Sequence, residues 1–149
     1  MKLAEALQER ADINRRIAQL RSRLMNNALT QEGELPAEDP NELLTELDGC
    51  VARLEKLIGD INHANCNTVV DGCTLTQLIA QRDALTMKLQ AYRELVSEAS
   101  CTAQRATRSE IRILSSVDVR ALQKKVDAMS KQLRELDAKI QMTNWTTDI

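Results

Sequence analysis

The chain has 149 residues, enough for one domain of ordinary size, and its 20 basic and 22 acidic residues give a formal net charge of −2. These charges are mixed along the chain, and the absence of a basic block argues against a general nucleic-acid-binding protein. The sequence contains no Phe, one Tyr, one Trp, two Pro and four Gly, which excludes an aromatic core and favours a few long helices with aliphatic faces.

A first helix is predicted from about Lys2 to Asn26, because apolar residues recur there three and four positions apart. The residues expected on its inner face are Leu3, Ala6, Leu7, Ile13, Ile17, Leu20 and Leu24. Arg10 interrupts this apolar seam. Either its stem packs while the charge reaches solvent, or it forms a buried ion pair with an acidic residue of another helix.

The next stretch, residues 27–39, is predicted to be an acidic loop because it contains no basic residue. A second helix is predicted over about residues 40–62, since Asp39 can cap it, Pro40 suits its first position and Glu42 completes a capping box. Its expected inner face is Leu43, Leu44, Leu47, Val51, Leu54, Leu57, Ile58 and Ile61.

Two glycines, Gly49 and Gly59, lie inside this second helix, where each costs about 1 kcal/mol relative to Ala. They indicate either the close approach of a neighbouring backbone or simple tolerance; a ligand-binding kink is a further alternative, without other support in the sequence.

Residues 61–73 are rich in Asn and close with Asp71-Gly72, a turn signal, so this stretch is predicted to be a loop. Within it, residues 68–70 (Thr-Val-Val) favour a very short strand.

The only histidine, His63, lies near Cys66 and Cys73. A structural zinc site needs four ligands and this stretch offers three, so we expect a surface histidine and no metal. The remaining cysteines are Cys50 and Cys101. All four are expected to be free thiols, because their spacing matches no zinc motif and a reducing compartment disfavours disulfides.

A third helix is predicted to begin after Thr74, with Gln77 completing a capping box, and to end at about Cys101. Its seam is Leu75, Leu78, Ile79, Leu85, Leu89, Tyr92, Val96 and Ala99. Arg82 occupies a seam position beside Asp83. Either it pairs with an acidic residue of another helix, or its stem packs and its charge reaches solvent.

Between this helix and the next, residues 111–113 alternate with their neighbours in a way that favours a second very short strand. The same segment is locally basic, with Arg105, Arg108 and Arg112. A fourth helix, capped by Ser116 or Asp118, is predicted to run to about residue 142, with a tail over 143–149. Its seam is Val119, Leu122, Val126, Met129, Leu133, Leu136 and Ile140, the a/d spacing typical of a coiled coil.

These elements predict a mainly all-α fold: four long helices in an antiparallel bundle or coiled-coil arrangement, forming a single helical domain over 1–149. In an up-down-up-down bundle, the acidic loop (Glu32, Glu34, Glu38 and Asp39) lies at the same end as the basic segment, where the two could form ion pairs. The two short strands would lie at opposite ends, so they could pair only through a bent bundle or a second chain. Narrow seams also leave apolar surface uncovered, which favours a homo-oligomer.

The stretch Met1–Asn14 carries charges where a signal peptide needs an unbroken apolar core. No apolar run approaches the roughly 18 residues of a membrane-spanning helix. We therefore expect a cytoplasmic protein without a membrane span.

Several motifs together carry a family resemblance. They are Lys2-Leu3-Ala4-Glu5-Ala6-Leu7 with Arg10-Ala11-Asp12, Gln31-Glu32-Gly33-Glu34 with Glu38-Asp39-Pro40, Ile61-Asn62 with Asn65, Arg82-Asp83, Ser109-Glu110-Ile111, and Lys131 to Asp137 leading to Ile140-Gln141 and Thr143-Asn144-Trp145. Over nearly its full length the chain resembles a family of small bacterial helical proteins often labelled septicolysin. The label implies a cytolysin, but the resemblance assigns no catalytic residue. Ala64 replaces the family's usual Thr, which argues against a polar role for the Asn-rich stretch.

Seams, mixed charge and the lack of convergent catalytic residue types favour a non-enzymatic helical oligomerising protein, acting as a scaffold or through a protein partner. It would need no cofactor and would bind itself rather than nucleic acid. The alternative is a ligand-binding protein or enzyme that uses a polar cluster. The candidate residues are Arg82, Asp83, Glu110, Asn62, Asn65, Asn144 and Trp145. A di-iron bundle is excluded by the single histidine. A septicolysin-like membrane-active toxin is a further alternative, although the chain lacks a basic face opposite an aromatic one.

Overall fold

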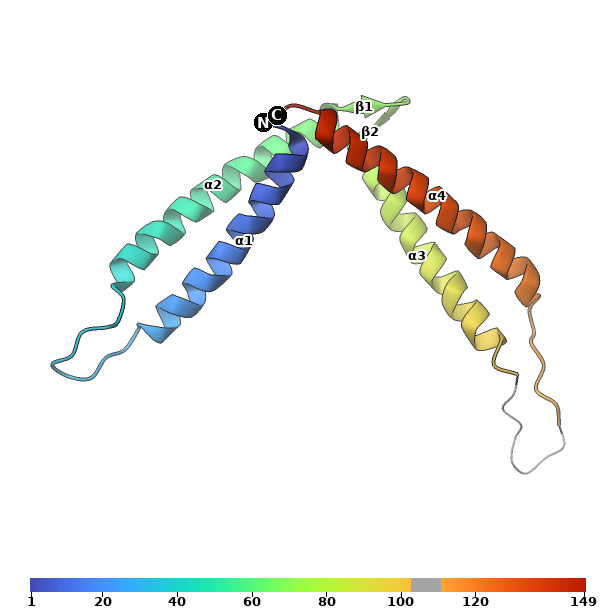
Figure 1. Cartoon of the computed structure of the whole chain (residues 1–149), viewed down its shortest axis with the longest axis horizontal. Helices are drawn as coiled ribbons and strands as arrows, with labels where there is room; N and C mark the ends of the chain where they lie inside the picture. Colours follow the sequence, from blue (N-terminus) through green and yellow to red (C-terminus); the bar gives the residue numbers. More distant parts are fainter. Residues whose placement is uncertain (103–110) are drawn as a thin grey trace. The chain divides into compact units, whose positions relative to one another are not determined.

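A computed structural model describes residues 1–102 and 111–149 (Figure 1). The fold is mainly all-α, as the apolar seams predict, with four long helices and two very short strands. The elements are α1 (Leu3–Asn26), α2 (Pro40–Asn67), β1 (Val69–Val70), β2 (Cys73–Thr74), α3 (Leu75–Ala99) and α4 (Val119–Thr146). The described chain divides into two compact units, Met1–Val70 with Thr143–Ile149, and Asp71–Met142. The expectation of a single domain stays a prediction.

In the first unit, α1 and α2 form an antiparallel hairpin (Figure 1). The ion pairs between the two helices join residues of rising number on α1 to residues of falling number on α2. In the seam of α1, Leu3, Ala6 and Leu20 are fully buried. On α2, Leu57 and Ile61 are buried in the same way. The hairpin is therefore stabilised by aliphatic side chains that neither helix could bury alone.

The helix α2 is longer than predicted, because it continues through Asn67 instead of ending near Asn62. The seam also continues, with Ile61 1% and Ala64 8% exposed. Burial of this face outweighs the weak helix propensity of the asparagines. The backbone N–H of Thr68 makes the last helical hydrogen bond, to the carbonyl of Ala64 at 2.9 Å, and the extended backbone of Thr68 ends the helix.

The assignment of the inner face of α2 is wrong at three positions. Leu44, Val51 and Ile58 are 45%, 48% and 41% exposed. Each follows a seam residue by one position, and at 100° per residue this places all three on one flank of the helix rather than on the seam. Cys50, half-buried, occupies the seam position that the prediction gave to Val51.

The strand predicted near residues 68–70 is confirmed as β1, and its neighbour in a two-stranded sheet is β2. The two residues between them, Asp71 and Gly72, have φ angles of +51° and +81°. Two consecutive positive φ angles are the geometry of the tight turn that joins hairpin strands. The second predicted strand is wrong, because residues 111–113 form no strand. Their alternation is too short to hold a strand without a partner beside it.

In the second unit, α3 and α4 lie side by side (Figure 1). They pack through a small apolar cluster. Its buried members are Leu89, Val126 and Met129, with Leu85, Tyr92, Val96 and Leu133 packed around them. The start of α3 is the predicted capping box: the Thr74 hydroxyl accepts from the Gln77 N–H at 3.2 Å, and the Gln77 side chain accepts from the Thr74 N–H at 2.8 Å. Asp118, not Ser116, accepts a hydrogen bond at the start of α4, from the N–H of Ala121 at 3.0 Å.

The predicted tail is partly helical, because α4 continues to Thr146, with Thr143 and Asn144 buried. The residues after it pair with the start of the chain. The N–H of Leu3 donates to the carbonyl of Thr147 at 2.9 Å, and Lys2 forms an ion pair with Asp148 at 2.9 Å. Among the described residues, no helix is both long and apolar enough to cross a membrane.

Candidate functional site

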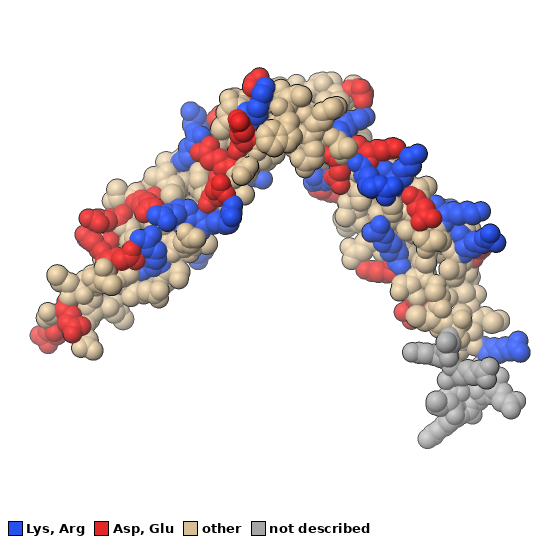
Figure 2. Space-filling view, viewed as in Figure 1, with Lys and Arg blue, Asp and Glu red and all other residues tan. Residues whose placement is uncertain are grey.

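One flank of the α1/α2 hairpin carries a row of ion pairs. Arg53 donates to both carboxylate oxygens of Glu9 at 2.7 and 2.8 Å, and the Nε of Arg16 donates to Glu46 at 2.6 Å. In Figure 2, basic and acidic side chains lie next to one another over these two helices. The hydrogen bond from Arg53 lowers the pKa of Glu9, and the same bond raises the pKa of Arg53. This flank fixes the register of the two helices rather than offering a free charge to a substrate.

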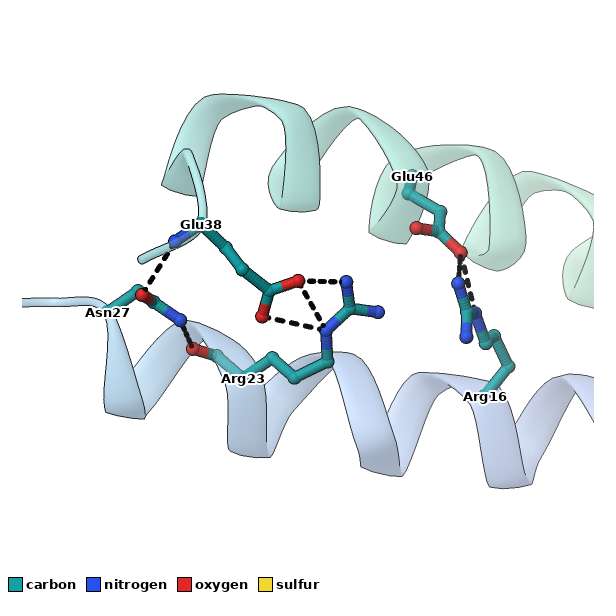
Figure 3. A network of polar contacts seen from close by, with 5 residues as sticks. All are labelled: Arg16, Arg23, Asn27, Glu38 and Glu46. Atoms are coloured by element: carbon teal, nitrogen blue, oxygen red, sulfur yellow. Dashed lines mark hydrogen bonds and ion pairs between the residues drawn. The ribbon is translucent and has the colours of Figure 1, made fainter. Parts of the chain in front are cut away.

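The row ends in a polar clamp at the base of the loop between α1 and α2 (Figure 3). The Nε of Arg23 donates to both carboxylate oxygens of Glu38 at 3.1 and 3.0 Å, and this lowers the pKa of Glu38. Asn27 is 8% exposed; its side chain donates to the carbonyl of Arg23 at 2.9 Å and accepts from the N–H of Glu38 at 3.0 Å. The two ends of the loop are therefore tied together by groups with satisfied hydrogen bonds.

The opposite flank of the same hairpin is apolar. The exposed residues Leu44, Val51 and Ile58 recur every seven residues along α2, so they form one row, which we call the apolar row. On α1, a hollow of about 250 Å³ on the helix surface is lined by Ala18, Arg21, Ser22 and Met25. At 100° per residue, the side chains of the apolar row point to one side of the seam and the side chains of the ion pairs point to the other.

A polar groove of about 560 Å³ lies near the end of α2, in the same unit. Its lining is Lys56, Asp60, His63, Ala64, Asn67, Thr68, Thr147, Asp148 and Ile149. The volume is typical of small-ligand sites, but such sites are mostly apolar with a few buried polar groups. Here His63 and Asn67 are exposed, and Asp148 already pairs with Lys2. The hydrogen bond from Lys2 lowers the pKa of Asp148.

The predicted polar cluster is only partly brought together. Arg82 donates to Asp83 at 3.0 and 2.8 Å, and its Nε lies 3.9 Å from the Asp137 carboxylate on α4. This is the pairing with another helix that the seam position of Arg82 allowed. Glu110 lies outside the described residues. Both Asp83 and Asp137 are exposed, so the group is a surface ion-pair cluster without an enclosed cavity around it.

The other four candidates do not converge on the polar groove. Asn62 is exposed and Asn65 half-buried on α2; on α4, Asn144 is 7% and Trp145 57% exposed. None of them lines the groove of about 560 Å³, whereas His63, one turn from Asn67, does. The i, i+4 spacing of His63 and Asn67 would have placed both on one helix face, had the helix been predicted to extend that far.

The four cysteines are free thiols, with Cys66 and Cys101 exposed and Cys50 and Cys73 half-buried. Within residues 1–102 and 111–149, no group of three or more His, Cys, Asp or Glu side chains could hold a metal ion. The arrangement around His63 therefore offers no metal-ligand set in the described part of the chain.

Comparisons with known proteins give a matching family and a similar solved structure. The profile of a family described as a family of unknown function (DUF6847) matches residues 10–149. The crystal structure of a functionally unknown conserved protein from Corynebacterium diphtheriae is 40% identical in sequence, with a TM-score of 0.90 over 99% of this chain and 97% of that one. No protein with a curated description matches the chain. Since the family profile covers nearly the whole sequence, the chain belongs to the DUF6847 family of unknown function.

Proposed function

We propose that this protein acts by assembly: it is a non-enzymatic helical scaffold whose α1/α2 hairpin packs against a second copy of the same chain. The single observation that supports this most directly is the apolar row. Three large aliphatic side chains at seven-residue spacing, between 41% and 48% exposed, are left unburied by their own hairpin. Rows of this spacing are covered by a partner helix in coiled coils.

The chemistry of this flank favours a second copy as the partner. Beyond the apolar row, α2 carries the exposed acids Asp48 and Glu55, while α1 carries the exposed Arg21 beside the hollow. In a two-fold dimer, the same patch meets itself, so Arg21 of each copy can face the acids of the other. The hollow on α1 then offers a place for a side chain of the apolar row. The patch thus carries charges of both signs that can pair in a two-fold dimer.

The test is sedimentation velocity at micromolar concentration on the full chain and two variants. Val51→Glu places a charge in the middle of the apolar row without burying it in the isolated chain. Ala52→Glu is the matched control, because Ala52 is the next residue on α2 and is exposed on its outer face. We expect a dimer for the wild type and Ala52→Glu, and a monomer of unchanged helix content for Val51→Glu.

A wild-type chain that remains monomeric at these concentrations would contradict the proposal. So would a dimer that Val51→Glu leaves intact. The same samples can be added to dye-loaded liposomes, because a membrane-active toxin of the kind that the septicolysin label implies would release the dye in proportion to protein.

A further inference from the structure

The loop between α1 and α2 is held together by hydrogen bonds at its base and is exposed to solvent at its tip. The clamp of Asn27 and Glu38 ties its ends together, as described above. At the tip, the N–H of Glu34 donates to the carbonyl of Gln31 at 3.0 Å across a turn in which Gly33 has a φ of +85°. A left-handed residue in such a turn strongly favours glycine. We call residues 28–37 the tip loop; it has its own hydrogen-bonded turn and a fixed base.

This ordered loop exposes two leucines. Leu29 and Leu35 flank the turn, and each is 91% exposed. Glu32 and Glu34 are exposed between them, and the tip loop contains no Lys, Arg or His. Single exposed leucines are ordinary on protein surfaces, but two on one short loop with a dedicated clamp form an apolar and acidic patch. The complement of such a patch is an apolar hollow with basic charge at its edge.

The described part of the other interhelical connection has that chemistry. Residues 111–114, which we call the receiver segment, expose Ile111 by 73%, Ile113 by 47% and Leu114 by 78%, with Arg112 exposed among them. Beside it lies an open surface hollow of about 170 Å³ whose apolar lining is Leu95, Ala99, Ile113 and Leu114, and Glu98 lines the same hollow. The basic charge available to the tip loop is therefore that of Arg112 on the receiver segment and does not belong to the hollow itself.

We propose that the tip loop of one copy docks on the receiver segment of a second copy, with Leu35 or Leu29 entering the hollow and the Glu32 and Glu34 carboxylates facing Arg112. The contact extends the self-association proposed above but uses other surfaces and does not depend on the apolar row. Because two different patches meet, the contact is heterologous. It repeats from copy to copy and produces species larger than a dimer.

An exchange of charges between the two surfaces tests whether the partner is a second copy of the chain and whether these charged residues form the contact. The double variant Glu32→Lys/Glu34→Lys repels Arg112, and Arg112→Glu repels the tip loop. Each alone is expected to raise the concentration for half-association by about tenfold or more, because like charges are brought together. A mixture of the two recovers association, since the basic loop of one variant meets the acidic receiver of the other. Sedimentation velocity is the readout, in the Val51→Glu background so that the apolar row does not contribute, and at concentrations above the micromolar range in which that variant is expected to be monomeric.

The apolar half of the contact is tested by Leu35→Ser, with Ala37→Ser as the matched control on the same exposed loop. The first is expected to lose the larger species at low salt, while the second keeps them. High salt is expected to weaken the contact because its charges are exposed, whereas a dimer held by the apolar row in the unmutated background persists.

Three results would overturn the proposal: no recovery of association on mixing, Leu35→Ser indistinguishable from Ala37→Ser, or no effect of salt. Docking within one chain would also overturn it, and would show as hydrogen-exchange protection of residues 111–114 that Leu35→Ser removes at every protein concentration. These outcomes can be told apart from a failure of the apolar-row proposal, because in that case the Val51→Glu variant would still form a dimer.

Discussion

The two helical hairpins follow the same seam spacing but differ in what flanks the seam. Between α1 and α2, three Arg–carboxylate pairs connect the helices: Arg53–Glu9, Arg16–Glu46 and Arg23–Glu38. Between α3 and α4, the polar connections that we describe are Arg93 to the Ser130 hydroxyl at 3.0 Å and Arg82 to Asp137 at 3.9 Å.

This difference in polar connections indicates that the seam and its flanks contribute differently to the structure. In both hairpins, burial of the aliphatic seam supplies the stability. In the α1/α2 hairpin, one flank is occupied by ion pairs, which fix the register at little net gain because they are exposed. Its other flank carries the apolar row, against which we propose that a second copy packs.

The largest expected effect comes from the seams themselves. Leu57 of α2 is fully buried and Leu89 of α3 is 2% exposed. Replacement of either by Ala leaves a cavity and is expected to lower the free energy of unfolding by about 2–5 kcal/mol. Urea unfolding followed by circular dichroism measures the loss. Hydrogen exchange should locate it mainly in α1 and α2 for Leu57→Ala, and in α3 and α4 for Leu89→Ala.

The matched control for these two substitutions is Val51→Ala in the apolar row. Because Val51 is 48% exposed, its truncation should cost well under 1 kcal/mol in the monomer, as ordinary surface changes do. A loss equal to that of Leu57→Ala would mean that the apolar row is part of the seam.

The next effect concerns the clamp of the α1/α2 hairpin. Replacement of Asn27 by Ala leaves the N–H of Glu38 and the carbonyl of Arg23 without their side-chain partner. A lost, largely buried polar contact of this kind costs about 1–3 kcal/mol. Thermal unfolding measures the cost, and Asn26→Ala is the control, since Asn26 is exposed. If both variants unfold at the same temperature, the clamp does not stabilise the loop.

The sequence predicts those features of the fold that depend on residues close together in the chain. The spacing of three and four at positions such as Leu20, Leu57 and Leu89 predicts all four helices, because each helix must bury one face. The capping residues Asp39 and Thr74 also mark the correct helix starts. The predicted end of α2 is too early, because the asparagines indicate a loop although Ala64 continues the seam.

The flanks could not be predicted, because they depend on register between segments far apart in the sequence. Arg53 and Glu9 are 44 residues apart, and nothing local to either says that they meet. For the same reason, the sequence did not separate Val51 from the seam: it is apolar and adjacent to a seam position. The candidate ligand-binding cluster around Arg82 stays a prediction; the structure shows only that Arg82, on an apolar seam, lies 3.9 Å from Asp137 of another helix.

A smaller effect comes from the glycines inside α2, which have no counterpart in α3 or α4. A Cβ at Gly49 or Gly59 would meet no atom within 4 Å. Gly49→Ala and Gly59→Ala are therefore each expected to stabilise the monomer by about 0.5–1 kcal/mol, through higher helix propensity. Gly72→Ala is the contrast in the strand turn, where a φ of +81° makes the same change destabilising. If Gly49→Ala or Gly59→Ala weakens self-association instead, that glycine lies in the contact with a second chain.

The smallest effect is the pH dependence, and it has opposite signs in the two hairpins. Hydrogen bonds from Arg53 and Arg23 lower the pKa values of Glu9 and Glu38. Their contribution to stability is present above the ordinary carboxyl range, near about pH 4, and is lost as the pH falls through the lowered values. In the second unit, the hydrogen bond to Asp71 raises the pKa of Lys139, so its contribution is present below the ordinary lysine pKa and is lost as the pH rises through the raised value.

Hydrogen exchange across a pH series should therefore show α1 and α2 opening first in acid, and the contact between α4 and the β1–β2 turn opening first in alkali. Arg53→Gln should flatten the acid response of the first hairpin, because Glu9 then titrates like an ordinary glutamate. Lys139→Gln should leave that acid response unchanged. An acid response that Arg53→Gln does not alter would mean that the ion pairs add nothing beyond register, and that the seam alone determines the stability of both hairpins.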